Sequence, residues 1–333
     1  MVLKNYRTLT ATQTYAGAAT TITTDLPRDF LIQRILLDFN GTTTIAGGVS
    51  VLVTDALLKN VASIKLKAVG EGSSRTIFDV AGNDLYYMNL FDYGFGTALQ
   101  NTDTAIAAHA QSTAWTIDMR INKQDPDDFS VSIPSYLLST LQLEITYNTS
   151  AVGYGTNVNA QAFTMGITLI EGIPEASEDF SSNPLLTVLS KTINTDASTG
   201  EQDLDTFFNV GAGIRRCFTC TETAAAVRSD TSILDYSVKS GQIPLMSKIN
   251  FRANKTKDIE NYRIAENIDG AWDVAGYTMI DFANNQQPFI PTASGLKIDL
   301  LSTIGYNVGD LILTVNKAAV SQIIRRVQET VEG

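Results

Sequence analysis

The chain has 333 residues, of which 44% are hydrophobic and 18% are charged, and a formal net charge of −11. Its length suffices for two domains that each bury a core, and its composition excludes a disordered chain. The acidity argues against nucleic acid as a specific partner, because like charges repel. No stretch approaches the about 20 apolar residues of a membrane span. The segment Met1–Arg7 lacks the apolar core of a secretion signal, so we expect folding in a cytoplasm.

The first half consists mostly of short runs rich in Thr, Val, Ile and aromatic residues, separated by Gly, Asn, Asp and Pro. This pattern is typical of an all-β sandwich or barrel. About eight strands favour a jelly roll, in which two four-stranded sheets pack face to face. The predicted strands are Ala19–Thr24, Leu31–Phe39, Val49–Val53, Ala62–Val69, Thr113–Arg120, Phe129–Ile133, Leu141–Asn148 and Ala162–Ile170.

One segment of this half, Asp84–Phe91, has two possible readings. A helix can begin there with Asn83 or Asp84 as its cap and end at Gly94. Another aromatic-rich strand fits the same residues equally well. Both readings stay open at the level of the sequence.

An acidic, turn-rich segment bracketed by prolines, residues 174–184, predicts a linker between a first jelly roll with an N-terminal arm (1–173) and a second one (185–316). The second half repeats the strand-rich pattern. Its predicted strands are Leu185–Ile193, Leu204–Val210, Arg215–Thr221, Ile233–Val238, Lys248–Arg252, Tyr277–Phe282, Gly295–Leu300 and Asp310–Asn316.

The last segment, residues 317–333, carries apolar residues at the spacing i, i+3, i+4, i+7 and i+11, which predicts an amphipathic helix outside both sandwiches. Arg325 and Arg326 fall largely on its other faces. The apolar positions are Val320, Ile323, Ile324, Val327 and Val331.

The two halves also resemble each other locally, in the same order along the chain. This shared order predicts two similar domains that arose by a diverged duplication. The matched segments are Asp25–Phe39 with Asp203–Phe218, Trp115–Met119 with Tyr277–Phe282, and Leu141–Asn148 with Leu311–Asn316.

Catalytic chemistry is difficult to place in this sequence. His109 is the only histidine, which argues against a His-based triad and excludes a metal site built from several histidines. Cys217 and Cys220 have CxxC spacing, but no other cysteine exists to complete a zinc site, so we expect buried free thiols. We predict no catalytic residue, no cofactor and no metal.

Two acidic groups are weak candidates for a site. The run Asp125–Asp128 has carboxylates that can bind calcium, but it lacks the alternating ligands of an EF-hand loop, and a solvated turn is the alternative that we favour. Asp203 and Asp205 can face one way on a strand, as a glycosidase pair does, without further support.

Three features together resemble a known family. They are Leu26-Pro27-Arg28 before Ile32–Ile35, the segment Asp79–Tyr86, and the tandem eight-strand layout. The chain resembles, along nearly its whole length, the double jelly-roll major capsid proteins of tailless icosahedral viruses, a lineage that includes adenovirus hexon and many membrane-containing viruses.

The resemblance implies a structural protein and no enzyme. It implies a homotrimer that forms a pseudo-hexagonal capsomer, contacts with neighbouring capsomers and with penton or minor capsid proteins, and a place in the virion capsid. In several relatives a basal face contacts an internal membrane. Here two groups of residues fit a contact with a membrane or a neighbouring subunit: Lys4 and Arg7 in an N-terminal stretch without acidic residues, and Val320, Ile323, Ile324, Arg325, Arg326 and Val327 in the predicted helix. Packing of that helix onto its own barrel or onto a neighbouring subunit is the alternative that we favour slightly.

Two other classes of function remain as alternatives. A tandem β-sandwich can bind carbohydrate, as lectins or receptor-binding fibre and spike proteins do, if aromatic side chains are exposed to stack on sugars. A β-sandwich glycosidase with paired carboxylates is the third reading. The aromatic candidates are Tyr86, Tyr87, Phe91, Tyr93 and Phe95.

Overall fold

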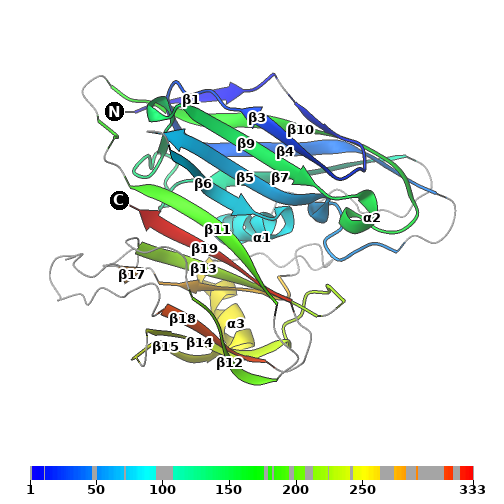
Figure 1. The fold of residues 1–333 in the computed structure, drawn as a ribbon, viewed down its shortest axis with the longest axis vertical. Helices are drawn as coiled ribbons and strands as arrows, with labels where there is room; N and C mark the ends of the chain where they lie inside the picture. Colours follow the sequence, from blue (N-terminus) through cyan, green and yellow to red (C-terminus); the bar gives the residue numbers. More distant parts are fainter. Residues whose placement is uncertain are drawn as a thin grey trace. The chain divides into compact units, whose positions relative to one another are not determined.

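The structure, a computed structural model, describes most of the chain. The described residues are 2–10, 12–46, 51–70, 73–94, 108–175, 179–181, 184–194, 199–206, 213–223, 225–240, 243–262, 274–282, 290–291, 311–317 and 323–332. They divide into two compact units, Met1–Leu186 and Thr187–Gly333. Each unit is built mainly of β-strands (Figure 1).

The first sheet of the first unit has the order β1-β10-β4-β7, with β2 added on β10 and β8 on β4. Burial alternates along its strands, as it must when one face of a sheet covers a core. In β4, Ile35, Leu37 and Phe39 are buried, whereas Asp38 and Asn40 are exposed. The strands are β1 (Leu3–Thr8), β2 (Gln13–Tyr15), β4 (Leu31–Ile45), β7 (His109–Asp118), β8 (Ile133–Pro134) and β10 (Val158–Ile173).

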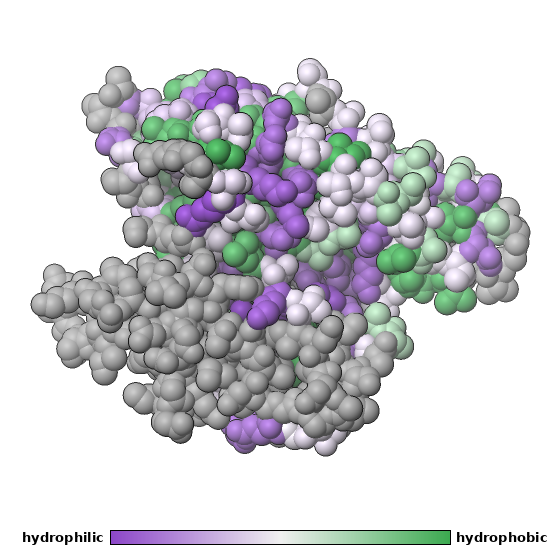
Figure 2. Space-filling view, viewed as in Figure 1, coloured by the Kyte–Doolittle hydropathy of each residue, from purple (hydrophilic) through white to green (hydrophobic). Residues whose placement is uncertain are grey.

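The second sheet of this unit has the order β3-β9-β5-β6. Its outward face is polar and its charges are paired across strands, with Lys67 Nζ 2.7 Å from a carboxylate oxygen of Glu144 and Lys65 Nζ 3.4 Å from one of Asp79. Figure 2 shows hydrophilic side chains gathered across this face. The strands are β3 (Thr20–Asp25), β5 (Val61–Gly70), β6 (Ser73–Val80) and β9 (Thr140–Tyr147).

Aromatic rings join the two sheets into one core. Phe39 of β4 stacks on Phe163 of β10 at 4.5 Å between ring centroids, and Tyr15 of β2 stacks on Tyr147 of β9 at 5.0 Å. All four rings are buried. Two antiparallel sheets that pack face to face with this strand order form a jelly roll.

The helix α1 (Gly82–Tyr93) settles the reading that the sequence left open. Ala81 occupies its N-cap position in place of the predicted Asn83 or Asp84, and Gly94 ends it in the left-handed conformation, with φ 76°. Most of its residues are buried on all sides, and Trp115 of β7 donates a hydrogen bond to the carbonyl oxygen of Gly82. Short helical turns lie at η1 (Leu58–Asn60), η2 (Ser135–Leu137) and α2 (Ser150–Gly153).

The second unit repeats this architecture. One sheet has the order β16-β13-β19-β11 with β17 on β13, and the other has the order β12-β18-β14-β15. A buried cluster that includes Cys217, Tyr236, Phe251 and Ile324 fills its core. The elements are β11 (Leu185–Asn194), β12 (Gly200–Thr206), β13 (Gly213–Glu222), β14 (Ile233–Ser240), β15 (Ile243–Asn250), α3 (Phe251–Tyr262), β16 (Tyr277–Asp281), β17 (Ile290–Pro291), β18 (Leu311–Lys317) and β19 (Ile323–Glu332).

The two units correspond strand by strand. In chain order and in pairing, β3, β4, β5, β6, α1, β7, β8, β9 and β10 of the first unit match β12, β13, β14, β15, α3, β16, β17, β18 and β19 of the second. The repeated segments of the sequence fall on matching strands: β3 and β4 with β12 and β13, β7 with β16, and β9 with β18. The prediction of two tandem jelly rolls is therefore confirmed.

The predicted C-terminal helix over 317–333 is wrong for Ile323–Glu332, which form β19. This strand pairs with β13 from Gly213↔Val331 to Glu222↔Ile323 and completes the second jelly roll. A spacing of four residues, as from Val327 to Val331, suits a strand face as well as a helix, because four is a multiple of the strand period of two. The β-branched residues then favour the strand. Val320 lies outside the described residues.

Other strand predictions need smaller corrections. Val51–Val53 form only an isolated bridge, Leu52↔Gly155, and of the predicted strand Phe129–Ile133 only Ile133 belongs to β8. The predicted strand Lys248–Arg252 ends at Asn250, where α3 follows. The predicted strand Gly295–Leu300 lies outside the described residues.

Candidate interaction surface

The histidine and the two cysteines that were considered for catalysis lie apart among the described residues. His109, at the start of β7, has its Nε2 3.4 Å from the hydroxyl of Tyr154. Cys217 and Cys220 are buried free thiols on β13. Among the residues that the structure describes, no group of three or more His, Cys, Asp or Glu side chains is placed to hold a metal ion.

The acidic run Asp125–Asp128 forms a turn, and its carboxylates accept hydrogen bonds from neighbouring groups. Asp125 accepts from the backbone N–H of Asp127 at 2.9 Å, and Asp128 accepts from the backbone N–H groups of Asn122 and Ser130 at 2.8 and 3.0 Å. Burial raises the pKa of Asp128, but the hydrogen bond from the hydroxyl of Ser130 and these backbone bonds outweigh it and hold the pKa below its usual value. The carboxylates therefore stabilise the turn. Asp203 and Asp205 lie in β12, and their side chains lie outside the described part of the chain.

The aromatic residues proposed to stack on sugars are mostly internal. Tyr86, Tyr87 and Phe91 are 1%, 3% and 1% exposed. Tyr93, at the end of α1, donates a hydrogen bond of 2.7 Å to Asp118. Phe95 lies outside the described residues. The lectin alternative therefore loses the observation on which it depended.

The two basic residues of the N-terminal strand are neutralised by acidic partners. Lys4 Nζ lies 2.5 Å from a carboxylate oxygen of Asp127, and Arg7 contacts Asp29 at 2.7 Å and Glu171 at 3.0 Å. Burial raises the pKa of Glu171, and the positive charge of Arg7 opposes this effect. These pairs leave no separate basic patch on β1.

The predicted contact residues of the last segment lie within the second unit. Ile324 is completely buried in the core cluster, and Arg326 and Val327 are 0% and 3% exposed. Arg325 is partly buried and pairs with Glu222 at 3.0 Å. Ile324, Arg326 and Val327 are therefore buried within the second jelly roll, whereas the predicted contact needs exposed side chains.

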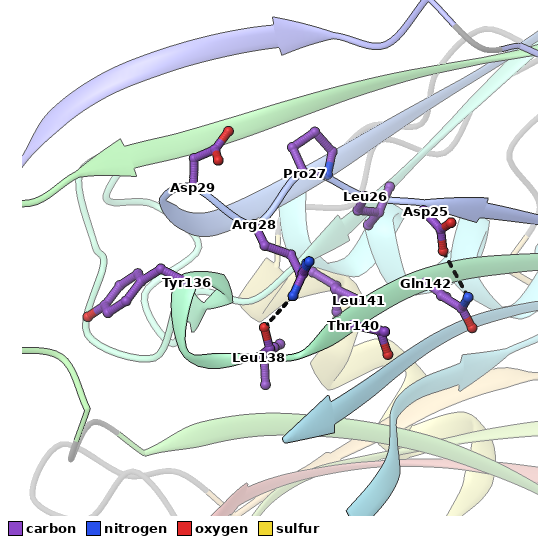
Figure 3. Close-up of a pocket in the computed structure, with 10 residues that line it drawn as sticks. All are labelled: Asp25, Leu26, Pro27, Arg28, Asp29, Tyr136, Leu138, Thr140, Leu141 and Gln142. Atoms are coloured by element: carbon purple, nitrogen blue, oxygen red, sulfur yellow. Dashed lines mark hydrogen bonds between the residues drawn. The ribbon is translucent and has the colours of Figure 1, made fainter. Parts of the chain in front are cut away.

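A polar hollow lies at one end of the first jelly roll. Its volume is about 550 Å³, and it lies between the segment that joins β3 to β4 and the segment from η2 to β9. Figure 3 shows Arg28 at its centre, donating a 2.7 Å hydrogen bond to the carbonyl oxygen of Leu138, and Gln142 donating one of 2.8 Å to Asp25. The lining residues are Asp25, Leu26, Pro27, Arg28, Asp29, Tyr136, Leu138, Thr140, Leu141 and Gln142.

Exposed apolar side chains lie at the same end. Leu3 pairs with Ile173 across β10, and Leu31, at the start of β4, pairs with Gly172 of β10 and with Pro134 of β8. The first residues of β1 and the turn η2 therefore share this end of the sheet. The exposed residues are Leu3, Tyr6, Tyr136 and Leu137, at 66%, 64%, 37% and 48%.

We name this end of the first unit, formed by the hollow and these four residues, the terminal surface. It has no nucleophile paired with a base and offers polar and apolar side chains together, as protein contact surfaces do. In the sequence, Leu26-Pro27-Arg28 stands out only as part of a family resemblance. The turn η2 is not predictable from the sequence, because short turns leave no periodic signal.

The geometry and topology of the chain define a double jelly-roll protein. Major capsid proteins of viruses have similar solved structures. The chain is similar to the major capsid protein of Sulfolobus turreted icosahedral virus, with 16% identity and a TM-score of 0.75, over 99% of this chain and 97% of that one.

Two further structures show the same fold at greater distance. The major capsid protein P2 of bacteriophage PM2 has 12% identity and a TM-score of 0.55, over 99% of this chain and 98% of that one. The protein VP54 of the virus PBCV-1 has 12% identity and a TM-score of 0.58, over 99% and 94%. No protein-family model and no curated protein matches the sequence.

Proposed function

We propose that this chain is the major capsid protein of an icosahedral virus, with a structural role and no catalytic one. The observation that carries the proposal is the likeness to a viral major capsid protein over 99% of this chain and 97% of that one, with the same tandem jelly rolls. The low charged fraction of 18% agrees with a chain that buries much of its surface against other protein. Its location is then the virion capsid.

The proposed assembly is a homotrimer. Each chain contains two jelly rolls of the same topology. A closed ring of three chains therefore contains six similar domains and can pack hexagonally with neighbouring rings. A single jelly roll per chain would need six copies for the same ring. The duplication seen in the strand order therefore supports a pseudo-hexagonal capsomer that contacts neighbouring capsomers and penton or minor capsid proteins.

Light scattering after size exclusion tests the trimer. We expect a particle of three times the chain mass of 36.1 kDa at micromolar concentration, and electron microscopy should show a six-sided outline. A chain that stays monomeric up to about ten times that concentration would contradict the proposal, since stable oligomers bury of the order of 800 Å² per partner.

The terminal surface is our proposed basal contact with an internal membrane. Leu3 and Tyr6 are exposed on β1, and apolar and aromatic side chains of these types bind at the interface of a bilayer. Among the residues that the structure describes, no helix has the length and apolar character to span a bilayer. The proposed contact is made by the exposed side chains of the terminal surface.

Vesicle flotation tests this contact separately. Trimers should float with vesicles that contain anionic lipid, and the variant that carries both Leu3→Ser and Tyr6→Ser should lose most of that binding while it remains trimeric. A matched control is Val152→Ser, which also removes an exposed apolar side chain, 57% exposed in α2. Equal flotation of the double variant and the control would exclude the proposed lipid contact and leave the capsid proposal intact.

A further inference from the structure

Both jelly rolls use a helix side chain to hold the free edge of a sheet. In the first unit, Asn89 of α1 accepts a 2.8 Å hydrogen bond from the N–H of Thr116 in β7 and donates a 2.9 Å bond to the carbonyl of the same residue. In the second unit, Asp258 of α3 accepts a 2.8 Å bond from the N–H of Met279 in β16. Among the described strands, β7 and β16 lie at the edges of their sheets.

The two contacts are equivalent in position. Asn89 and Asp258 are each the eighth residue of their helix, and Thr116 and Met279 each precede an Ile-Asp pair. A bonded edge residue is less available to pair with another strand, which edge strands otherwise do. Because the same contact occurs at equivalent positions in both jelly rolls, we infer that it belongs to the architecture of the fold.

The chemistry of the two contacts differs. An amide both donates and accepts, so Asn89 alone satisfies the backbone of Thr116. The carboxylate of Asp258 only accepts, and a second residue, Asn254, donates 2.8 Å to the carbonyl of Met279. Asp258 also accepts a 2.7 Å bond from the hydroxyl of Thr278.

Helix α3 depends on these polar contacts more than α1 does. The described side chains that α3 buries below a tenth of their surface are Phe251, Asn254 and Asp258, which form one stripe with a single apolar member. Helix α1 buries Leu85, Tyr86, Met88, Leu90 and Phe91 among others. Because apolar burial holds α1, and hydrogen bonds hold most of α3, the state of Asp258 affects docking of α3 directly.

We propose that Asp258 makes the docking of α3 on the edge strand β16 stronger in acid, and we call this contact the latch. The equivalent contact of Asn89 with β7 in the first unit does not respond to pH. The strongest geometric support is that the three hydrogen-bond donors, from Met279, Thr278 and Asn254, all converge on Oδ2. Among the residues that the structure describes, Oδ1 is buried and accepts no hydrogen bond, and its charged neighbour is Lys257 Nζ at 3.6 Å. A proton added at Oδ1 therefore removes a buried charge and leaves every bond at Oδ2 in place.

The titration of Asp258 has the sign that the latch requires. Burial raises its pKa to about 6. The N–H of Met279, the hydroxyl of Thr278 and the charge of Lys257 each lower the pKa, but burial outweighs them. A carboxyl whose pKa is higher in the docked state binds its proton more tightly there, so docking is favoured as pH falls from about 6 to about 4. Above about pH 6 the buried carboxyl is ionised, and the stabilisation that its protonation gives to the docked helix is lost.

Few other titratable groups of the described residues face Asp258. Lys257 Nζ lies 3.6 Å from Oδ1, and the buried Tyr236 of β14 reaches the site through the hydroxyl of Thr278 at 3.3 Å. Burial raises the pKa of Tyr236 well above its ordinary value, so it stays neutral. Lys255 pairs with Asp230, and Lys248 of β15 pairs with Glu201.

Hydrogen exchange of the whole protein tests the latch. After correction for the intrinsic rate, protection of the β16 peptide should rise about 10-fold from pH 7.5 to pH 5, because about one pH unit of the titration lies in that range. Asp258→Asn replaces the carboxylate by an uncharged amide of the same shape. This variant should show higher protection of the β16 peptide at pH 7.5, and that protection should no longer depend on pH. The β7 peptide, held by Asn89, serves as the internal control.

The reverse substitution makes the test independent of how Asp258→Asn folds. Asn89→Asp should introduce into β7 the same rise of protection in acid and lower its protection at pH 7.5. Protection of β16 that does not change between pH 5 and pH 7.5 would overturn the proposal. Dependence on pH that persists unchanged in Asp258→Asn would overturn it equally, since another group would then be responsible. Neither outcome bears on whether the chain forms trimers.

Discussion

Replacing Glu329 by glutamine is expected to destabilise the second jelly roll by about 3–5 kcal/mol, because it leaves buried positive charge without its partner. Glu329 is 1% exposed and receives Arg216 through two bonds of 2.7 and 2.6 Å, and Arg215 through one of 2.7 Å. These bonds join β13 to β19 in addition to the backbone pairing of the two strands, so their loss weakens the attachment of β19 to its neighbour.

Hydrogen exchange of the β13 and β19 peptides measures the loss locally, and protection should fall more than 100-fold, since about 1.4 kcal/mol corresponds to a factor of ten. Glu201→Gln is the matched control. Its pair with Lys248 is exposed, with side chains 42% and 55% accessible, and such pairs contribute about 0–1 kcal/mol. If both variants lose equally little protection, the buried pair does not hold the strands together.

Replacing Asp118 by alanine should destabilise the first jelly roll by a similar amount, about 3–5 kcal/mol. The carboxylate is buried at the end of β7 and accepts bonds of 3.0 and 2.6 Å from Arg120 and one of 2.7 Å from Tyr93. Lys123 Nζ lies 3.8 Å away. Removing it leaves two buried cations unpaired and frees the end of α1, which Tyr93 attaches to β7.

Two measurements test this effect: the free energy of unfolding of the variant, and the hydrogen-exchange protection of its β7 and α1 peptides. Asp127→Ala is the control, because Asp127 is 75% exposed although it also pairs with a lysine, Lys4. We expect a change below about 1 kcal/mol there. Equal effects of the two substitutions would show that burial of the Asp118 cluster contributes no stability of its own.

The Asp118 cluster also predicts how the first unit responds to acid. Burial alone raises the pKa of Asp118, but the charge of Lys123 and the bonds and charge of Arg120 outweigh it and lower the pKa to about 2. A carboxyl with a lowered pKa stabilises the fold above its ordinary value of 3.8 and loses this contribution, about 2 kcal/mol, as pH falls toward 2. The stability of Asp118→Ala should therefore depend less on pH below 4.

The sequence predicted those strands whose patterning is strong. β3, β4, β5, β7, β9 and β10 follow alternation or β-branched runs, and the repeated segments identified the duplication. α1 remained ambiguous because it is buried on all sides, and a helix without a polar face has no 3.6-residue pattern. α3 was missed because its buried stripe holds Asn254 and Asp258, which read as solvent-facing residues.

The error at β19 has a different cause. Its buried face includes Arg326, Gln328 and Thr330, so that polarity along the strand does not reveal burial. The partner of Arg216 lies more than 110 residues later in the chain, as Glu329, and no local pattern connects the two. The terminal surface was also unpredictable in detail, since it combines the start of β1, the β3–β4 segment and η2.

The position of β19 has a consequence for synthesis of the chain. In each jelly roll the strand that lies between others of its sheet, β10 or β19, is the last of that sheet to leave the ribosome. The first barrel can close once Ile173 has emerged, while the second is still being translated, and the second waits for residues 323–332. Nascent chains arrested after Ile173 but before residues 323–332 have emerged should therefore contain one folded barrel followed by an incomplete sheet. The unpaired strands of that sheet are exposed, so we expect chaperones to bind this intermediate.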